Sequence, residues 1–239
     1  MSTLTKEMTF YERVTHLVKR EVALKKKMIY SGLTAIVILL VISQILLSIY
    51  PWIIEPFAPV IYSFTFTIFT YAGYAFSSIM FNELHTSATA PQFLTLPATA
   101  FEKLTAAWLV SYVAYTVVGV LALIILHWIT GHGGQMLTGT GLTDFYVYTV
   151  TQSIFLFGGV YFKKNNFLAT VVALMVLFLG FSLFVLAINT FFPGAEQNLF
   201  FISSEWKFIT LFGGLPASTL TSLFFLGLAY KKLKNKQIA

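Results

Sequence analysis

Residues 167–192 read FLATVVALMVLFLGFSLFVLAINTFF, without a single Asp, Glu, Lys or Arg. A helix needs about 20 predominantly apolar residues to cross the hydrocarbon core of a bilayer, and this run is long enough to do so. We therefore predict a membrane-spanning helix here. Five more dense apolar runs lack all four charged residue types and are also predicted to span: residues 28–50, 57–81, 104–129, 145–162 and 208–230.

The composition of the whole chain supports this interpretation. Of its 239 residues, 57% are hydrophobic and only 10% are charged, and the mean hydropathy is +0.80. Soluble domains carry about 25% charged residues, because they must present a large hydrated surface. The composition therefore excludes soluble secreted, nuclear and cytosolic proteins. The chain has no cysteine, which rules out disulfides and thiolate metal sites.

The positions of the charges assign a side of the membrane to each loop. Residues 84–101 contain two prolines and many polar side chains, so we do not count them as a lipid-exposed span. With six spans, every Lys and Arg except Lys207 falls on one side, and these residues accumulate in cytoplasmic loops. We predict an all-α membrane protein with six transmembrane helices over residues 28–230. Both termini are then cytoplasmic, including a basic tail at 231–239, and the protein lies in the plasma (inner) membrane.

Residues 1–27 precede the first predicted span and combine basic side chains with apolar ones at helical spacing. This pattern predicts an amphipathic interfacial helix on the cytoplasmic side, which braces the first span or touches a partner. The alternative is a plain basic segment that orients the chain through its attraction to anionic lipid. The apolar stripe consists of Phe10, Val14, Leu17, Val18 and Val22.

The predicted spans contain no charged residue, so a proton relay or ion-coupled carrier lacks its usual groups. The motifs of zinc proteases, serine hydrolases and phosphate-binding loops are all absent, and no Gly-Lys dipeptide occurs. We therefore expect no catalytic residue, metal site, cofactor or ATP site on this chain, and no nucleic-acid partner. Gln44, Gln152 and Asn189 are expected to make hydrogen bonds between helices. Close helix approach is expected at Gly73, Gly119, Gly158, Gly159, Gly180 and Gly227.

The cytoplasmic loop before the third span is the most informative stretch. Thr99-Ala100-Phe101-Glu102 predicts a capping box, which starts a helix below the membrane. Residues 89–96 predict a short helix with Thr89 as its cap, ended by Pro97. This short helix is expected to expose Phe93, Leu94 and Leu96 as a docking surface. Alternatively, these side chains pack back on the bundle or on lipid headgroups.

At these residues the chain resembles the permease subunits of bacterial type-2 ATP-binding cassette exporters. The resemblance lies in Glu83, in the sequence FLTLPATAFEK of residues 93–103, and in the order of two spans, a cytoplasmic loop and four more spans. It implies that a separate ATPase subunit binds this loop, and that the permease pairs with an identical or related permease. The resemblance assigns docking to Gln92, Phe93, Leu94 and Leu96, and assigns the joint that transmits motion to Pro97, Thr99 and Glu102.

The resemblance further implies that residues 193–207 dip into the outer leaflet, where Phe200, Phe201 and Trp206 suit the interface. An ordinary aromatic belt accounts for these three residues equally well. Aromatic residues make up 17% of the chain, which suits an apolar or amphipathic cargo such as a lipid, peptide or drug. The alternative function is a non-transport membrane scaffold, or a channel-like protein without an ATPase.

Overall fold

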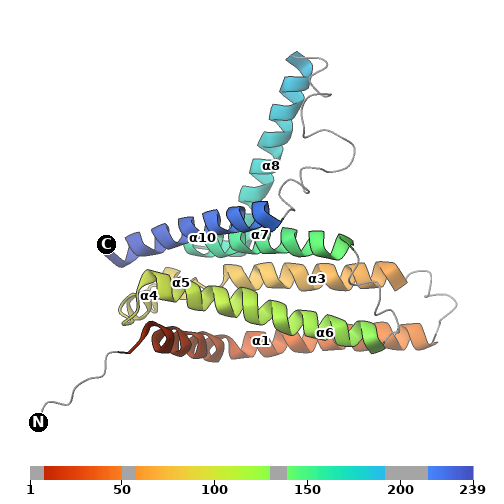
Figure 1. The fold of residues 1–239 in the computed structure, drawn as a ribbon, viewed down its shortest axis with the longest axis horizontal. Helices are drawn as coiled ribbons and strands as arrows, with labels where there is room; N and C mark the ends of the chain where they lie inside the picture. The colour runs from red at the N-terminus through yellow and green to blue at the C-terminus, as the bar shows by residue number, and fades with distance from the viewer. Residues whose placement is uncertain (1–7, 50–57, 130–138, 192–214, 239) are drawn as a thin grey trace, which may run out of the picture.

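A computed structural model describes residues 8–49, 58–129, 139–191 and 215–238, and all regular structure in these ranges is helical (Figure 1). Two short helical elements lie in the loop that connects the second and third predicted spans. In chain order the elements are α1 (Phe10–Ile49), α3 (Ala58–Ser78), the 3-10 turn η2 (Asn82–His85), α4 (Ala90–Leu94), α5 (Ala100–Trp108), the π-helical segment η3 (Leu109–Ala114), α6 (Tyr115–Ile129), α7 (Gly139–Tyr161), α8 (Asn166–Phe191) and α10 (Leu215–Ile238).

The predicted all-helical class is confirmed for the described residues. Among the described residues, two stretches are long and apolar enough to cross a membrane, judged by length and composition alone: Ala100–Ala122 and Asn166–Ala187. Both overlap predicted spans, the third and the fifth. The structure is therefore compatible with a membrane protein, while the count of six spans and their orientation stay predictions.

The helices form an elongated bundle with one outlying member. In Figure 1, α1, α3, α6, α7 and α10 run lengthwise beside one another, whereas α8 projects away from them. The start of α1, the end of α10 and the short α4 gather at the same end of the bundle, which we call the α4 end. The side of the membrane on which the two termini lie stays a prediction.

Helix α1 joins two segments that the sequence analysis separated. It runs without interruption from Phe10 to Ile49, so the helix has no break at residue 27. Its first turns pack along α5 and bury Val14 and Leu17, while Phe10 and Val22 of the expected stripe are exposed. The amphipathic part of α1 therefore braces the bundle through protein contacts.

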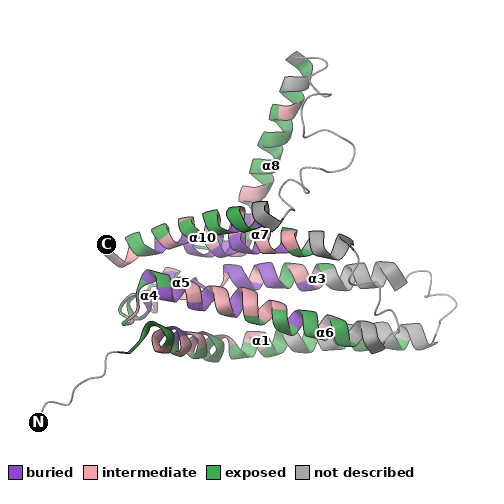
Figure 2. Cartoon of the chain, viewed as in Figure 1, coloured by how far each residue is buried: buried purple, intermediate pink, exposed green. Residues whose placement is uncertain are grey.

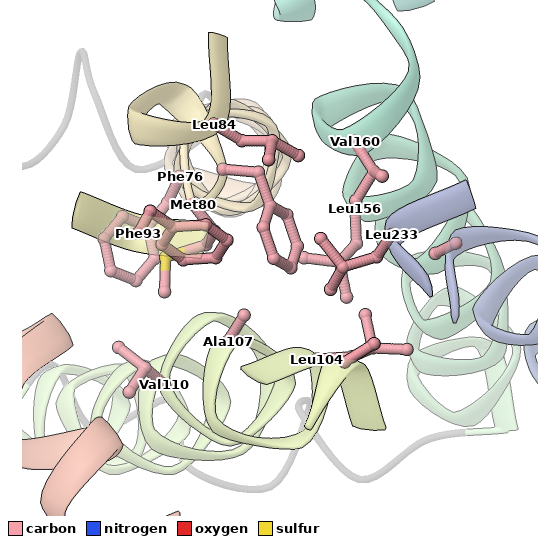
Figure 3. Packing of buried hydrophobic residues seen from close by; sticks show 13 residues of the cluster. Phe76, Met80, Leu84, Phe93, Leu104, Ala107, Val110, Leu156, Val160 and Leu233 are labelled. Atoms are coloured by element: carbon pink, nitrogen blue, oxygen red, sulfur yellow. The ribbon is translucent and has the colours of Figure 1, made fainter. Parts of the chain in front are cut away.

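The hydrophobic core lies near the α4 end. Met80, Phe81, Leu156, Val160 and Leu233 are all at most 1% exposed, and they join the end of α3 to α7 and α10 (Figure 3). Helix α8 has the opposite character, since most of its described side chains are exposed (Figure 2). An apolar helix that the protein leaves uncovered is suited to lipid contact.

Glycine allows close helix approach at some of the predicted positions only. A Cβ atom added at Gly159 would lie 2.6 Å from the Ser78 backbone oxygen, and Gly73, Gly119 and Gly158 are similarly crowded by side chains. Gly180 and Gly227 have nothing within 4 Å of such an atom, so the prediction is wrong for these two. Spacing along a helix does not reveal which face meets a neighbour.

Candidate functional site

Helix α4 forms inside the loop at residues 82–103, as the sequence predicts, but it is shorter than expected. It begins after Thr89, contains Pro91 in its first turn and ends at Leu94, where the Thr95 amide donates to Pro91 O at 2.9 Å. The helix therefore stops before the predicted end at Leu96. The Thr89 hydroxyl donates to Glu83 O at 3.0 Å and makes no capping bond, so that part of the prediction is wrong.

Phe93 faces the interior of the protein, which corrects the expectation that it is an exposed docking residue. Its side chain lies among the buried residues labelled in Figure 3 and is 3% exposed. It packs edge-on against Phe81, with ring centroids 6.2 Å apart. Leu94 and Leu96 are half-buried against the same core. The reason is that burying a large aromatic ring in the core of its own chain removes its apolar surface from water and so lowers the free energy of the folded state. Gln92, by contrast, is exposed on the outer face of α4.

Lys103 holds α4 in place, a role that the sequence analysis did not foresee. Its side chain is buried, and its Nζ donates to Phe93 O at 2.8 Å and to Leu94 O at 3.2 Å. These carbonyls end a helix and lack intrahelical donors, and a cation is favourable beside them. Nζ also lies 5.1 Å from the centroid of the Phe93 ring. Lys103 therefore clamps the end of α4 onto the first turn of α5.

The capping box at the start of α5 is confirmed. The Glu102 amide donates to Thr99 Oγ1 at 3.3 Å, and the Thr99 amide donates to Glu102 Oε2 at 2.7 Å. The other carboxylate oxygen, Glu102 Oε1, accepts from Arg13 Nε at 2.8 Å. Glu102 is only 1% exposed, so this buried carboxylate joins α5 to α1. Pro97 is exposed and lies just before the capping box.

A second ion pair joins α1 to the start of the same loop. Arg20 Nη2 lies 2.5 Å from Glu83 Oε2, and Arg20 also pairs with Glu21 at 3.0 Å. Arg13 and Arg20 lie about two helical turns apart, on one face of α1. Glu83 and Glu102 bracket the loop at residues 82–103, so the two pairs hold both of its ends. This matching of two arginines to two glutamates is the signal in the sequence that would have predicted the contact.

Comparison with protein-family models, curated proteins and solved structures finds no match to this chain. Any assignment of function therefore depends on the residues and geometry of the molecule itself. Phe200, Phe201 and Trp206, the predicted outer interfacial residues, lie outside the described part of the chain. Within the described ranges, no group of three His, Cys, Asp or Glu side chains is placed to hold a metal ion.

A buried polar centre lies deeper in the bundle. Gln152 of α7 is fully buried, and its Nε2 donates to Ser77 Oγ at 2.9 Å and to Ser111 Oγ at 3.2 Å. Gln152 thus joins α3, η3 and α7, as predicted for a polar residue inside the bundle. Ser111 lies in the π-helical segment, a feature that often marks functional positions in helices. The side chains of Gln44 and Asn189, the other two predicted polar contacts, lie outside the described residues.

Proposed function

We propose that this chain is the transmembrane permease subunit of an ATP-binding cassette exporter, with ATP hydrolysed by a separate ATPase subunit. The observation that carries the proposal is the attachment of α4 to the helices around it. Lys103 fixes the end of α4 to α5, Phe93 anchors it in the core, and Arg13 holds Glu102 at the capping box. A short helix can transmit the movement of a bound partner only if it is rigidly attached to the elements that must move.

Movement of α4 would then be passed to two parts of the bundle. The continuous stretch α5–η3–α6 begins at the capping box, so a displacement of α4 reaches the third predicted span directly. The ion pairs of Arg13 and Arg20 carry the same displacement to α1. This is a rigid-body mechanism, in which packed helices shift together when a partner closes.

The surface offered to the ATPase is the outer face of α4. Pro91, Gln92 and Thr95 are exposed there, and Leu94 and Leu96 are half-buried beside them. This surface replaces the predicted one, in which Phe93 was a contact residue. Phe93 keeps its place in the site as the anchor beneath the docking surface.

The remaining features of the proposal concern the assembly and its cargo. Two permease subunits, identical or related, would form the pathway in the plasma membrane. An apolar or amphipathic cargo such as a lipid, peptide or drug suits the Phe-rich spans. The exposed apolar surface of α8 supports a location in lipid.

The test is to purify the tagged full chain from its host in mild detergent, and to measure ATP hydrolysis and the amount of co-purifying ATPase. We compare the unaltered chain with Gln92→Lys and with Asn235→Lys, which adds the same charge at an exposed amide on α10, on the same predicted side of the membrane. A lysine buried against the ATPase without a partner costs more than about 1.4 kcal/mol, so Gln92→Lys is expected to reduce ATPase retention at least about ten-fold. Asn235→Lys is expected to leave retention unchanged.

Equal retention in both variants would show that α4 does not contact the ATPase. Purification without any ATPase in several detergents would favour a scaffold or a channel-like protein. The thermal stability of each variant is measured as well, to separate a loss of binding from unfolding. Because Gln92 and Asn235 are both exposed, neither substitution is expected to unfold the chain.

A further inference from the structure

A cavity of about 610 Å³ opens between the end of α3, the turn η2 and the connection from α7 to α8. Its volume is within the range of sites that hold small molecules. The lining residues are of two kinds: Asn82, Thr86 and Lys163 are polar, whereas Ile79, Phe167 and Leu168 are apolar. A cavity lined by both polar and apolar side chains suits a ligand that is itself polar at one end and apolar at the other.

The charge of the lining favours a negatively charged ligand. Lys163 supplies an ammonium group, and no acidic side chain is among the described residues that line the cavity. Glu83, on the same turn as Asn82, is engaged by Arg20. The first residues of α8 also line the cavity, and the first amides of a helix have no intrahelical partner and favour an anion.

The cavity is also held in a defined shape by buried hydrogen bonds. The Asn166 side chain is 5% exposed, and its amide donates to Gly159 O at 3.1 Å and to Asn82 Oδ1 at 3.2 Å. Because the Asn82 oxygen is directed to Asn166, the Asn82 amide nitrogen, which is a hydrogen-bond donor, is turned away from it. Asn165 adopts a left-handed conformation with φ of 47°, which redirects the chain sharply into α8.

From these observations we propose that the cavity binds a phosphate group carried by an anionic phospholipid. Lys163, Asn82 and the start of α8 would hold the phosphate. Leu168 lines the cavity, and Val172 lies one helical turn further along α8. These two side chains are 58% and 50% exposed and offer a surface for the acyl chains. A free phosphate ion would use the polar lining residues alone and leave Ile79, Phe167 and Leu168 without a role. The proposal depends on the predicted membrane location but not on an ATPase partner.

The test uses the purified full chain without any partner, in detergent, and counts bound lipids by native mass spectrometry. Phosphatidylglycerol is compared with phosphatidylcholine, which carries the same phosphodiester but no net charge. The variant is Lys163→Gln, and its matched control is Lys164→Gln, the adjacent exposed lysine that does not line the cavity. We expect phosphatidylglycerol to be preferred, and its binding to fall about five-fold in Lys163→Gln and to be unchanged in Lys164→Gln.

Three results would overturn the proposal. Equal binding of both lipids would show that charge is not recognised, and equal loss in both lysine variants would show a diffuse attraction of lipid to basic residues. Displacement of phosphatidylglycerol by inorganic phosphate at equal concentration would identify a site for the free ion instead of a lipid. Because no ATPase is present, none of these results depends on whether the proposed transport function is correct.

Discussion

At the scale of single residues, the burial of Phe93 determines which experiments on the loop are informative. A polar substitution there would bury a polar group in the core without a hydrogen-bond partner, so a loss of ATPase binding would be indistinguishable from misfolding. The exposed Gln92 avoids this difficulty, because it lies on the same short helix without entering the core. Phe93 is better used to measure how strongly α4 is anchored.

We predict that Phe93→Ala lowers the free energy of unfolding by about 3–5 kcal/mol, because it removes a buried ring and leaves a cavity. Phe178→Ala is the matched control, since Phe178 lies on α8 and is 66% exposed. Denaturant or thermal unfolding in detergent measures both variants. Equal losses of stability would contradict the burial of Phe93.

His85 links three segments at the α4 end. Its Nε2 lies 2.8 Å from Gly159 O, and because a carbonyl only accepts, Nε2 carries the proton. Nδ1 is then left to accept from Lys236 Nζ at 3.4 Å. Burial lowers the pKa of His85 below its usual value, and the nearby positive charges of Lys236 and Lys163 lower it further, against the opposing effect of the Gly159 bond.

The sign of the resulting pH dependence follows from this lowered pKa. The unfolded chain takes up a proton near its usual pKa of about 6.5, whereas the folded chain takes it up only at lower pH. Stability is therefore expected to fall as the pH drops from about 7 through the folded pKa of His85. The melting temperature should decrease less over this range in His85→Gln than in the unaltered chain. An identical decrease in both proteins would exclude His85 as the source.

At the scale of elements, Gly159 allows the backbones of α7 and α3 to approach closely. A Cβ atom at Gly159 would meet the Ser78 backbone oxygen at 2.6 Å, and a backbone atom within a packed helix end is not free to move aside. Gly180, on α8, has open space around it. The two glycines look alike in the sequence, since both lie within predicted spans, but they differ in what faces them.

We predict that Gly159→Ala destabilises the protein by about 1–3 kcal/mol, because the added methyl group forces α7 away from α3. Gly180→Ala is expected to be neutral or slightly stabilising, since alanine is the better helix former. Thermal unfolding of the two variants under the same conditions provides the measurement. A loss of stability in Gly180→Ala equal to that in Gly159→Ala would show that α8 is packed in a way that the described structure lacks.

At the scale of the whole molecule, the bundle has one well-packed end and one exposed helix. The loop at residues 82–103, the first turns of α1 and the end of α10 share the α4 end, where the ion pairs Arg13–Glu102 and Arg20–Glu83 lie. Helix α8 projects from this bundle. Two described stretches are long and apolar enough to cross a membrane, and Asn166–Ala187 of α8 is the less buried of them. In the proposed function, the protein partner binds at the α4 end and lipid contacts α8.

The absence of cysteine makes the predicted topology directly testable. Single cysteines are introduced at Ser87 in the loop, at Asn235 near the end of α10 and at Lys207, which lies outside the described residues. We expect a membrane-impermeant maleimide to label position 207 in intact cells, and to label positions 87 and 235 only in inverted vesicles. Labelling of positions 87 and 235 from opposite sides would contradict the six-span prediction, since both lie on the same predicted side.

The helical class of the molecule, the short helix in the loop and the capping box at Thr99 and Glu102 could be predicted from the sequence, but the end of the short helix and the partner of Thr89 could not. Long apolar runs favour helices wherever they occur, and the capping box depends on residues only three positions apart, so neither needs information from distant parts of the chain. The direction of each side chain required the tertiary structure. Phe93, Lys103 and Glu102 are buried because α1, α5 and the end of α3 meet around them, and Gly159 differs from Gly180 for the same reason. The spacing of residues along a helix shows which of them share a face, but only the packing of the helices decides which face is buried.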